Sequence, residues 1–573
     1  MAQRERTESP VVLGIEGTAW AASAAVYDAA TDDVVIETDA YQPESGGIHP
    51  REAAEHMQEH VPRVVETALD HARELAREDP DRGPDDPPVD CVAVSRGPGL
   101  GACLRVAGTA ARAVAQTLEV PLVGVNHMVA HLEIGRHRSG LSSPVCLNAS
   151  GANAHVLGFH DGRYRVLGET MDTGVGNAID KFTRHVGWSH PGGPKVEEAA
   201  KEGEYVDLPY VVKGMDFSFS GIMSAAKDAY DGGRPVEDVC TGLQETIFAM
   251  LAEVSERALS LTGSDELVLG GGVGQNRRLQ AMLRGTCEDR GADFYVPEDR
   301  FLRDNAGMIA VLGAKMYRAG DTLPVEESRV DPDFRPDQVP VTWRGREPWA
   351  APADGASGRR PRDEGESVAR VPPEQREVRG AEAVVVIEDG TVVKRRLPKD
   401  YRHPELDVKL RRDRTVMESR LTSEARRHGV PTPVVRDVDL QEATITFQEV
   451  GDADLGRALT GERVRAVGRH LAAIHGAGFV HGDPTTRNVR VRKDSSETDA
   501  GDPGVFLIDF GLGFYTDHVE DYAMDLHVFE QALAGTADDP PATIEAFEGG
   551  YREAGDERVL DQLREIEGRG RYQ

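Results

Sequence analysis

Two stretches of the chain carry the same succession of apolar runs and turn residues. Residues 11–40, VVLGIEGTAWAASAAVYDAATDDVVIETDA, predict a strand, a glycine turn, a strand, a turn and a third strand. Residues 144–170, PVCLNASGANAHVLGFHDGRYRVLGET, predict the same order. Helical segments follow each copy, so the pattern predicts a duplicated α/β domain with a cleft between its two halves.

The turns in this region are rich in small residues. The first turn of each copy is a glycine with small neighbours, EGTA at 16–19 and SGAN at 150–153. A third apolar run, ELVLGGGVGQN at 266–276, passes into glycines and then into a helix. Such turns expose backbone N–H groups and suit phosphate or nucleotide. Most glycine turns only reverse the chain, but three in one region, two of them matched, favour a nucleotide site.

The apolar pattern stops at residues 344–376, which are rich in Pro, Gly and charge. We therefore expect two domains, 1–340 and 377–573, joined by a flexible linker at 341–376.

The composition is strongly acidic, with 98 acids, 66 bases and a formal net charge of −32. Few lysines among the bases favour adaptation to high salt over an ordinary acidic protein. This charge argues against an overall basic, nucleic-acid-binding surface but leaves room for a local arginine patch. The five cysteines form no CxxC pair and predict buried, reduced thiols. Without a signal core or a long apolar run, we expect a cytoplasmic protein.

The segment NHMVAHLE at 126–133 is the first candidate for chemistry. It places His127 and His131 four residues apart, on one face of a predicted helix, where both imidazoles can hold one metal ion. Met128 stands where a zinc protease has its glutamate base. Asp304, between a strand-like and a helix-like segment, is the candidate third ligand. Two His and one carboxylate suit iron(II) or zinc acting as a Lewis acid, although most His pairs at this spacing bind no metal.

Residues 1 to about 335 closely resemble the universal tRNA threonylcarbamoyladenosine transferase family, as found in the archaeal KEOPS complex. Ten motifs in order carry the resemblance: LGIEGTA, GGIHPREAAEHM, SRGPGLGACLRVAG, NHMVAHLE, ASGANAHV, DTGVGNAIDK, HPGGPKVEE, FSFSGIMSA, LGGGVGQN and RDNAGMIA. The resemblance implies an α/β fold built as a duplicated actin-like, sugar-kinase-like (ASKHA) domain. It also implies transfer of a threonylcarbamoyl group from threonylcarbamoyl-AMP to N6 of the adenosine beside the tRNA anticodon.

The resemblance further assigns roles to individual residues. It makes His127, His131 and Asp304 the ligands of one divalent iron or zinc ion. It places the adenylate on the following residues: Asn148, Ala149, Ser150, Gly151, Ala152, Asp180, Gly193, Glu197 and Asn276. Asp180 fits ribose hydroxyls better than a base role, and a plain solvated acid is the alternative for both Asp180 and Glu197. Asn148 stands where many relatives have a Tyr that approaches the metal, which leaves the identity of the metal open.

The C-terminal region carries kinase-like spacing. EAVVVIEDGTVVKRR (382–396) predicts a two-strand hairpin with Lys394 in its second strand. In HGDPTTRNV (481–489) and LIDFGLG (507–513), Asp483 would orient a hydroxyl as proton acceptor. Asn488 and Asp509 would hold magnesium, and Lys394 would contact the phosphates of ATP.

Three further residues complete the predicted ATP site. Glu418 is the expected partner of Lys394, with Glu424 as competitor; a solvated helix face is the alternative for either. Glu449, followed by Val450, is placed at the hinge near adenine.

The region departs from ordinary protein kinases. RGAEAVV replaces the glycine-rich loop, HGD replaces HRD, and no APE motif follows DFG. A peptide-docking platform is therefore not expected. The region resembles the small atypical, RIO-related kinase of KEOPS, also in LPKDYRHPELD (397–407) and GVPTP (429–433). That resemblance implies a small α+β kinase-like domain that acts mainly as an ATPase with magnesium, or as a Ser/Thr kinase, held near the transferase by fusion.

Two other functions compete with a bifunctional tRNA-modification protein. One is a metal-dependent protease, against which Met128 argues. The other is a signalling Ser/Thr kinase with a non-catalytic, regulatory N-terminal domain. The expected partners are tRNA, threonylcarbamoyl-AMP and ATP, and resemblance adds the small dimerising subunit and the tRNA-binding subunit of KEOPS. The tail GRGRYQ (568–573) could touch RNA, although a frayed terminus is the simpler reading.

Overall fold

The computed structural model divides the chain into two compact units, Met1–Ser357 and Gly358–Gln573. It describes residues 8–41, 49–160, 162–344, 376–492, 504–537 and 539–569. Most of the linker predicted at 341–376 lies outside the described residues. Among the helices described, none is both long and apolar enough to cross a membrane.

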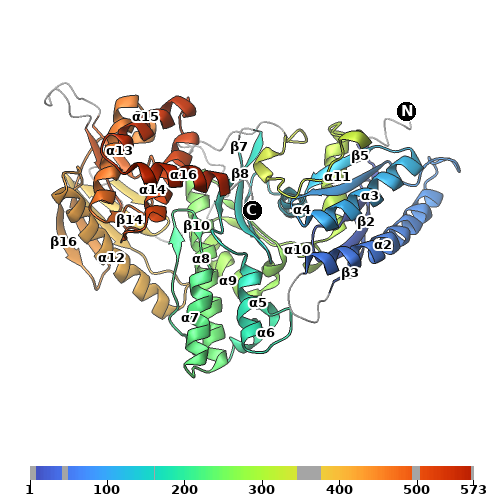
Figure 1. The fold of residues 1–573 in the computed structure, drawn as a ribbon, viewed down its shortest axis with the longest axis horizontal. Helices are drawn as coiled ribbons and strands as arrows, with labels where there is room; N and C mark the ends of the chain where they lie inside the picture. The colour runs from blue at the N-terminus through green and yellow to red at the C-terminus, as the bar shows by residue number, and fades with distance from the viewer. Residues whose placement is uncertain are drawn as a thin grey trace, which may run out of the picture. The chain divides into compact units, whose positions relative to one another are not determined.

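The first sheet of the N-terminal unit has the order β3-β2-β1-β4-β5 (Figure 1). β1 pairs antiparallel with β2, which pairs antiparallel with β3; β1, β4 and β5 run parallel. The strands are β1 (Val11–Glu16), β2 (Ala21–Asp28), β3 (Asp33–Ala40), β4 (Cys91–Gly97) and β5 (Leu122–Asn126). The predicted strand–turn–strand order of residues 11–40 is confirmed.

The second sheet repeats this connectivity in the order β12-β11-β6-β7-β8. β6, β7 and β8 form the antiparallel part, while β6, β11 and β12 run parallel. The strands are β6 (Val145–Ala149), β7 (Ala154–His160), β8 (Arg163–Glu169), β11 (Glu266–Gly270) and β12 (Asp293–Tyr295). Because each strand occupies the same place in both sheets, the duplication predicted from the apolar pattern is confirmed.

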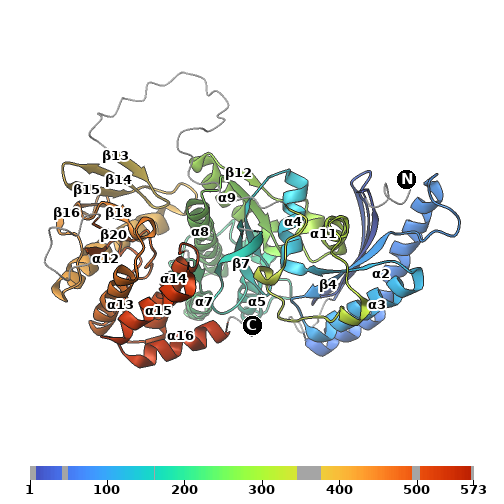
Figure 2. The same cartoon turned by 90° about the horizontal axis from the view of Figure 1, so that it is seen from above.

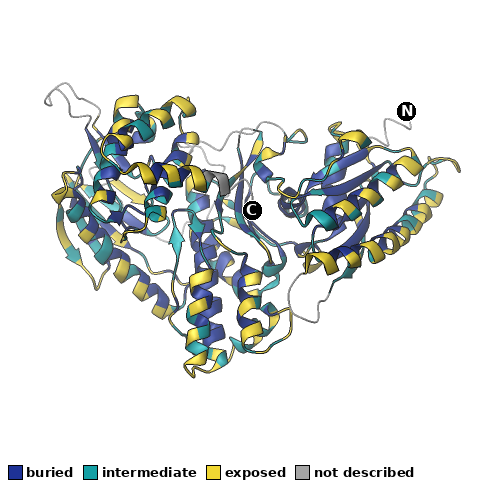
Figure 3. Cartoon of the chain, in the orientation of Figure 1, coloured by how far each residue is buried: buried dark blue, intermediate teal, exposed yellow. Residues whose placement is uncertain are grey.

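Helices cover both faces of the first sheet (Figure 2). On one face, α2 (Pro50–Glu78) and α3 (Gly101–Leu118) share a core with Leu13, Ile15 and their neighbours. On the other face, α4 (His127–Ser139) and α11 (Ala306–Arg318) share a core with residues of both sheets. The central strands of both sheets, β1, β4, β6 and β11, are mostly buried (Figure 3). α4 and α11 therefore form the layer between the two halves.

α11 lies very close to β1 because position 14 is a glycine. A Cβ atom at Gly14 would stand 2.4 Å from the carbonyl oxygen of Ala306 and 2.8 Å from the backbone nitrogen of Ala310. Any side chain there would push the start of α11 away from the sheet. The loop before α11 is thereby held at the carboxyl end of β1.

The second sheet carries further helices and a small ladder. α8 packs on β6, β7 and β11, and α9 follows the glycines after β11. The remaining elements are α5 (Val175–His185), α6 (Gly193–Ala199), β9 (Val212–Lys213), β10 (Asp216–Phe217), α7 (Ser220–Asp231), α8 (Val236–Thr262), α9 (Arg277–Arg290) and α10 (Asp299–Leu302). The five cysteines are free and buried, as predicted.

The C-terminal unit combines an antiparallel sheet with a group of helices. The sheet order is β13-β14-β15-β17-β16, and the predicted hairpin of residues 382–396 is confirmed as β14 and β15. Its strands are β13 (Arg376–Arg379), β14 (Ala383–Glu388), β15 (Thr391–Arg396), β16 (Val435–Asp439) and β17 (Thr444–Gln448). α12 (Pro404–Arg427) packs on β16 and β17.

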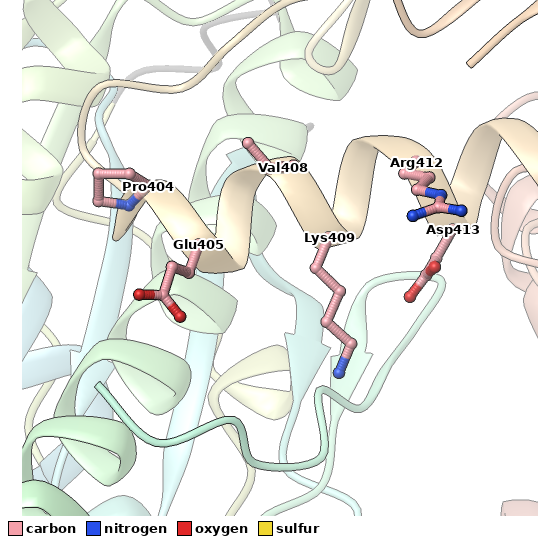
Figure 4. A pocket seen from close by; sticks show the side chains of 6 residues that line it. All are labelled: Pro404, Glu405, Val408, Lys409, Arg412 and Asp413. Atoms are coloured by element: carbon pink, nitrogen blue, oxygen red, sulfur yellow. The ribbon is translucent and has the colours of Figure 1, made fainter. Parts of the chain in front are cut away.

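The rest of this unit is mainly helical around a core of its own. Its elements are β18 (Ala453–Asp454), α13 (Gly461–Gly476), β19 (Phe479–Val480), β20 (Val489–Val491), β21 (Val505–Leu507), β22 (Phe514–Tyr515), α14 (Val519–Ala534), α15 (Pro540–Arg552) and α16 (Glu557–Arg569). The first turns of α12 also line a pocket through Pro404, Glu405, Val408, Lys409, Arg412 and Asp413 (Figure 4). None of these six residues belongs to the predicted ATP site.

Candidate metal and nucleotide sites

The structure brings the three predicted metal ligands together. His127 Nε2 lies 3.3 Å from Asp304 Oδ1, and His131 Nε2 lies 3.4 Å from the same oxygen. The two imidazole rings meet edge to face, with centroids 4.8 Å apart. The His131 side chain is only 1% exposed, so the cluster is closed on that side.

Helix caps next to the ligands fix their positions. The Asn126 side chain accepts hydrogen bonds from the backbone N–H groups of Met128 and Val129, both at 3.0 Å, and so starts α4 at His127. Asn305 caps α11 in the same way, accepting from the Met308 N–H at 3.0 Å. Sequence placed Asp304 directly after a strand-like segment, but the short helix α10 stands between β12 and Asp304.

The cluster fits a divalent metal. Ligand atoms bound at ~2.0–2.1 Å to a tetrahedral ion lie about 3.4 Å from one another, close to the distances found here. Both ring nitrogens of His131 are buried without a hydrogen-bond partner among the described residues. A buried polar atom without a partner is costly, and a metal ion at the common focus would satisfy one of the two nitrogens.

A fourth side chain, Glu16, supports the cluster from behind. Its Oε2 lies 3.2 Å from His127 Nδ1 and also accepts a hydrogen bond from the Ser95 hydroxyl. Its Oε1 accepts from the Thr18 N–H at 2.8 Å. A carboxylate on the far nitrogen fixes the orientation of a ligating imidazole. The sequence analysis missed this role, although the Glu of EGTA stands at the end of β1 in a turn it had singled out.

The electrostatics of the metal-free cluster favour one positive charge. Burial lowers the pKa of His127, but the carboxylates of Glu16 and Asp304 outweigh it and raise that pKa to about 10. Burial is also the main reason why the pKa of His131 is lowered. Burial would raise the pKa of Asp304, yet the charge of His127 and the close approach of both imidazoles hold it well below its usual range. A proton on His127 therefore supplies the positive charge that a bound cation would otherwise supply.

Asn148 lies beside this cluster at the end of β6. Its amide nitrogen lies 3.5 Å from Met128 Sδ, and its Oδ1 is buried without a hydrogen-bond partner among the described residues. A Cβ at Gly270 would stand 3.5 Å from both Asn148 Oδ1 and the His131 carbonyl oxygen. Asn148 thus offers an unsatisfied acceptor next to α4.

The predicted adenylate turn, which includes Ala149 and Ala152, packs against the start of α5. The Ser150 N–H donates to the Asn153 carbonyl at 2.9 Å, and the Asn177 N–H donates to the Gly151 carbonyl at 2.9 Å. A Cβ at Gly174 would stand 2.4 Å from the Gly151 carbonyl oxygen, so a side chain there would displace the turn.

The remaining predicted adenylate residues already have partners within the protein. Asp180 accepts from the Gly192 N–H at 2.8 Å and lies 3.1 Å from His190 Nδ1. Glu197 accepts from the Arg277 N–H at 2.8 Å.

Asn276 caps α9, accepting from Arg278 N–H at 2.9 Å and from Leu279 N–H at 3.1 Å. Gly193 begins α6 and has open space where a Cβ would stand. Asp180, Glu197 and Asn276 therefore have structural tasks that the sequence did not reveal.

In the C-terminal unit, the structure gathers four charged side chains. Lys394 Nζ lies 2.9 Å from Glu418 Oε1 and 2.6 Å from Asp509 Oδ1. Arg396, which the sequence analysis did not consider, donates to Glu418 Oε2 at 2.5 Å. Glu418 is therefore the partner of Lys394, whereas Glu424 pairs with Arg427 and His428 at the end of α12.

Asp509 sits in an unusual backbone conformation. Its φ of 65° lies in the left-handed region, which a non-glycine residue seldom adopts. Burial would raise its pKa, but Lys394 and then Arg396 hold the pKa well below the usual range. Because 41% of the side chain is exposed, solvent weakens this ion pair.

Hydrogen bonds from Asn488 and to Asp525 fix the loop that carries Asp483. Asn488 Nδ2 donates to the Asp483 carbonyl at 2.8 Å and to its carboxylate at 3.0 Å. Buried Asp525 accepts from the backbone N–H groups of His481 at 2.6 Å and Gly482 at 2.8 Å.

Glu449 follows β17. Its side chain is exposed, and its N–H donates to the Gly390 carbonyl at 3.0 Å.

Comparison with known proteins decides between the candidate families. A family model described as tRNA N6-adenosine threonylcarbamoyltransferase matches residues 30–311. A relative from Halobacterium salinarum is 67% identical over 98% of both chains, and one from Natronomonas pharaonis is 70% identical over 98% of this chain and 99% of its own. Both carry the name "Probable bifunctional tRNA threonylcarbamoyladenosine biosynthesis protein".

The chain belongs to this bifunctional family. The resemblance found in the motifs is confirmed, and it extends over both units because these relatives are matched over nearly their whole length. A relative with the same name from Methanospirillum hungatei, 48% identical over 98% of this chain and 99% of its own, extends the family further. The acidic composition agrees with relatives from halophilic archaea such as Haloarcula marismortui.

Proposed function

We propose that the first unit transfers the threonylcarbamoyl group of threonylcarbamoyl-AMP to N6 of the adenosine beside the anticodon of tRNA. The observation that carries this proposal is the His127–His131–Asp304 cluster, which lies in a chain of a family named for this biosynthesis. We propose that these three residues hold iron(II) or zinc. Neither a metal-dependent protease nor a signalling Ser/Thr kinase finds support among the relatives.

The chemistry asks the protein mainly to position its reactants. The N6 amine attacks the carbonyl carbon of the mixed anhydride, a C–N bond forms, the C–O bond to phosphate breaks and AMP leaves. When bound, the cation would supply Lewis-acid polarisation of a carbonyl or phosphate oxygen. The leaving group is already activated, so orientation and charge stabilisation are the main requirements.

The chain's own residues would bind and orient the adenylate. A Cβ would have open space at Gly193 and nothing nearer than 3.9 Å at Gly151, so phosphate would be able to approach the backbone closely at both positions. Asp180 would exchange its contact with Gly192 for the ribose hydroxyls. Glu197 and Asn276 would act by holding α6 and α9 in place, since both bind the start of α9.

We further propose the domain division 1–340, linker 341–376 and 377–573. The matched strand order of the two sheets supports an actin-like (ASKHA) fold for the first domain, because that fold is a duplicated α/β unit. The sheet-plus-helix composition supports an atypical kinase fold for the last domain.

In that domain, Asp483 would orient the attacking hydroxyl or water, and Asn488 and Asp509 would hold magnesium. Lys394, positioned by Glu418, would contact the phosphates of ATP, and Glu449 would lie near adenine. The Lys394–Glu418 contact at 2.9 Å supports this assignment. Cytoplasmic tRNA and the small dimerising and tRNA-binding subunits of KEOPS are the proposed partners.

A transferase assay tests the proposal. Purified full-length protein at high salt is supplied with tRNA and threonylcarbamoyl-AMP, with and without ATP, and modified adenosine is measured by mass spectrometry. We expect modified adenosine from the native chain. We expect Asp483→Asn to lower ATP turnover by about 10²–10³-fold while bound metal stays unchanged, since general base catalysis is worth this much. Loss of the metal in that variant would contradict the separation of the two sites.

A further inference from the structure

The first unit contains a second cluster of two histidines and one aspartate. Asp39 Oδ1 lies 3.4 Å from His56 Nε2, and Asp39 Oδ2 lies 2.9 Å from His60 Nδ1. One donor atom from each of the three residues lies within 4.8 Å of the others. The proposed function uses none of these residues.

Two elements meet to form this cluster. His56 and His60 stand four residues apart on α2, on one face of the helix, and Asp39 is near the end of the edge strand β3. α2 covers the face of the sheet opposite to α11, so this cluster and the Asp304 cluster lie on different faces. They are therefore independent sites within one unit.

One ring nitrogen of the cluster lacks an ordinary hydrogen bond, whereas His56 Nε2 also lies 3.1 Å from the Asp39 carbonyl oxygen. His60 Nδ1 is buried and has no hydrogen-bond partner among the described residues, although the Asp39 carboxylate is 2.9 Å away. The same feature marks His131 in the other cluster. The carboxylate–imidazole distance of 3.4 Å to His56 matches the separation of about 3.4 Å between ligands of a tetrahedral ion, and the distance of 2.9 Å to His60 is shorter than it.

The two imidazoles also share a single carboxylate. Their rings stack 4.2 Å apart, with planes inclined by 19°. An imidazole nitrogen and a carboxylate oxygen are both donors that a divalent transition-metal ion accepts.

We propose that Asp39, His56 and His60 bind a divalent transition-metal ion of the zinc class. Two nitrogens and one oxygen suit Zn²⁺, with water in the remaining position. Asp39 is 45% exposed and the two imidazoles are 13% and 19% exposed, so an ion can enter from solvent. The ion fastens the edge strand β3 to α2, a structural role that leaves the transfer chemistry to the other cluster.

Counting bound zinc tests the proposal. The full-length chain is stripped with a chelator, dialysed against Zn²⁺ and analysed by plasma mass spectrometry. We expect two ions per native chain, one in His60→Gln, one in Asp304→Ala and none in the variant with both changes. His71→Gln, on the same helix but outside the cluster, is the matched control and should retain both ions.

Two further measurements guard against a folding defect. Asp39→Asn changes only the half-exposed carboxylate and should also lose one ion, and circular dichroism shows whether each variant is folded. Zn²⁺ should raise the Tm of Asp304→Ala, but not that of the variant with both changes. The second site does not exist if the native chain binds a single ion and Asp304→Ala abolishes it. The second site also does not exist if His60→Gln and Asp39→Asn both retain two ions. Either result leaves the proposed transferase function untouched.

Discussion

The two units bury carboxylates at their candidate sites but neutralise them in different ways. In the C-terminal unit, fixed cations do so: Lys394 and Arg396 share Glu418, and Lys394 also reaches Asp509. In the N-terminal unit, no lysine or arginine among the described residues forms an ion pair with Asp304. Only imidazoles face that carboxylate.

The positive charge that balances the Asp304 cluster is therefore exchangeable, whereas the positive charge that balances the Glu418 cluster is permanent. The Asp304 cluster can be balanced by a proton on His127 or by a divalent ion, so its charge depends on what is bound. The Glu418 cluster is balanced without any ligand, so under the proposed function magnesium would arrive with ATP and compete with Lys394 for Asp509. We therefore expect substitutions to act through bound metal in the first unit and through ATP affinity and stability in the second.

The largest effect is expected from Asp304→Ala. Among the described residues, it removes the one carboxylate that both His127 and His131 contact. The ion at the His127–His131 cluster should be lost, which lowers bound metal by one ion per chain, and transfer should slow about 10³-fold or more, because a Lewis acid supplies several kcal/mol. Plasma mass spectrometry and the transferase assay measure both quantities.

Asp299→Asn is the matched control for this change. Asp299 starts the neighbouring helix α10 and makes only a loose pair, 3.7 Å from Arg277. It should leave metal content and transfer rate as they are. If Asp304→Ala still bound the ion of the His127–His131 cluster, the distinction between the two units would be lost.

The next largest effect is expected from Glu418→Gln. It leaves Lys394 and Arg396 without their shared carboxylate in a buried place, which costs about 3–5 kcal/mol of stability. Misplacement of Lys394 should lower kcat/KM for ATP on the order of 10²-fold. Calorimetry and ATPase kinetics measure the two effects.

Glu424→Gln gives the comparison, because Glu424 lies on the same helix but pairs with Arg427 at its exposed end. ATPase kinetics of that variant should match the native chain. Equal effects of both substitutions would mean that the ion pair does not position Lys394.

Sequence predicted the strands and the duplication, because these leave local marks, and the structure brings His127, His131 and Asp304 together as expected. Strands follow from alternating apolar runs, and His127 and His131 share one helix. Glu16 was missed because its contact with His127 spans 111 residues, and no local pattern encodes such a pair. Arg396 was missed because strand position alone does not show that it reaches Glu418 beside Lys394.

The same limit applies to residues that also have a structural task. The resemblance places Glu197 and Asn276 on the adenylate, and both side chains also hold the start of α9. Asn276 lies at the boundary between a glycine-rich turn and a helix, where a side-chain cap is as frequent as a ligand contact. Motifs mark such positions without saying which of the two tasks their side chains perform.

A smaller effect is expected from Glu16→Gln. The amide keeps the size of the carboxylate but removes the charge behind His127. Loss of such a supporting group typically lowers metal affinity about 10–100-fold, far less than loss of a ligand. Competition with a chelator of known affinity measures this shift. Unchanged affinity would mean that Glu16 only holds the turn at Thr18.

The smallest effect is expected from Asn126→Ala, which tests whether the cap or the metal holds the start of α4. Asn126 accepts from two backbone N–H groups and donates to the Phe334 carbonyl at 2.8 Å. Losing the cap should cost about 1 kcal/mol and lower the Tm of the first unit in calorimetry. Asn126→Ser retains a capping oxygen and should recover most of that loss. Saturating Zn²⁺ should shrink the difference between Ala and Ser if the ion on His127 also orders the first turn. A difference that zinc leaves unchanged would mean that the cap and the metal act independently.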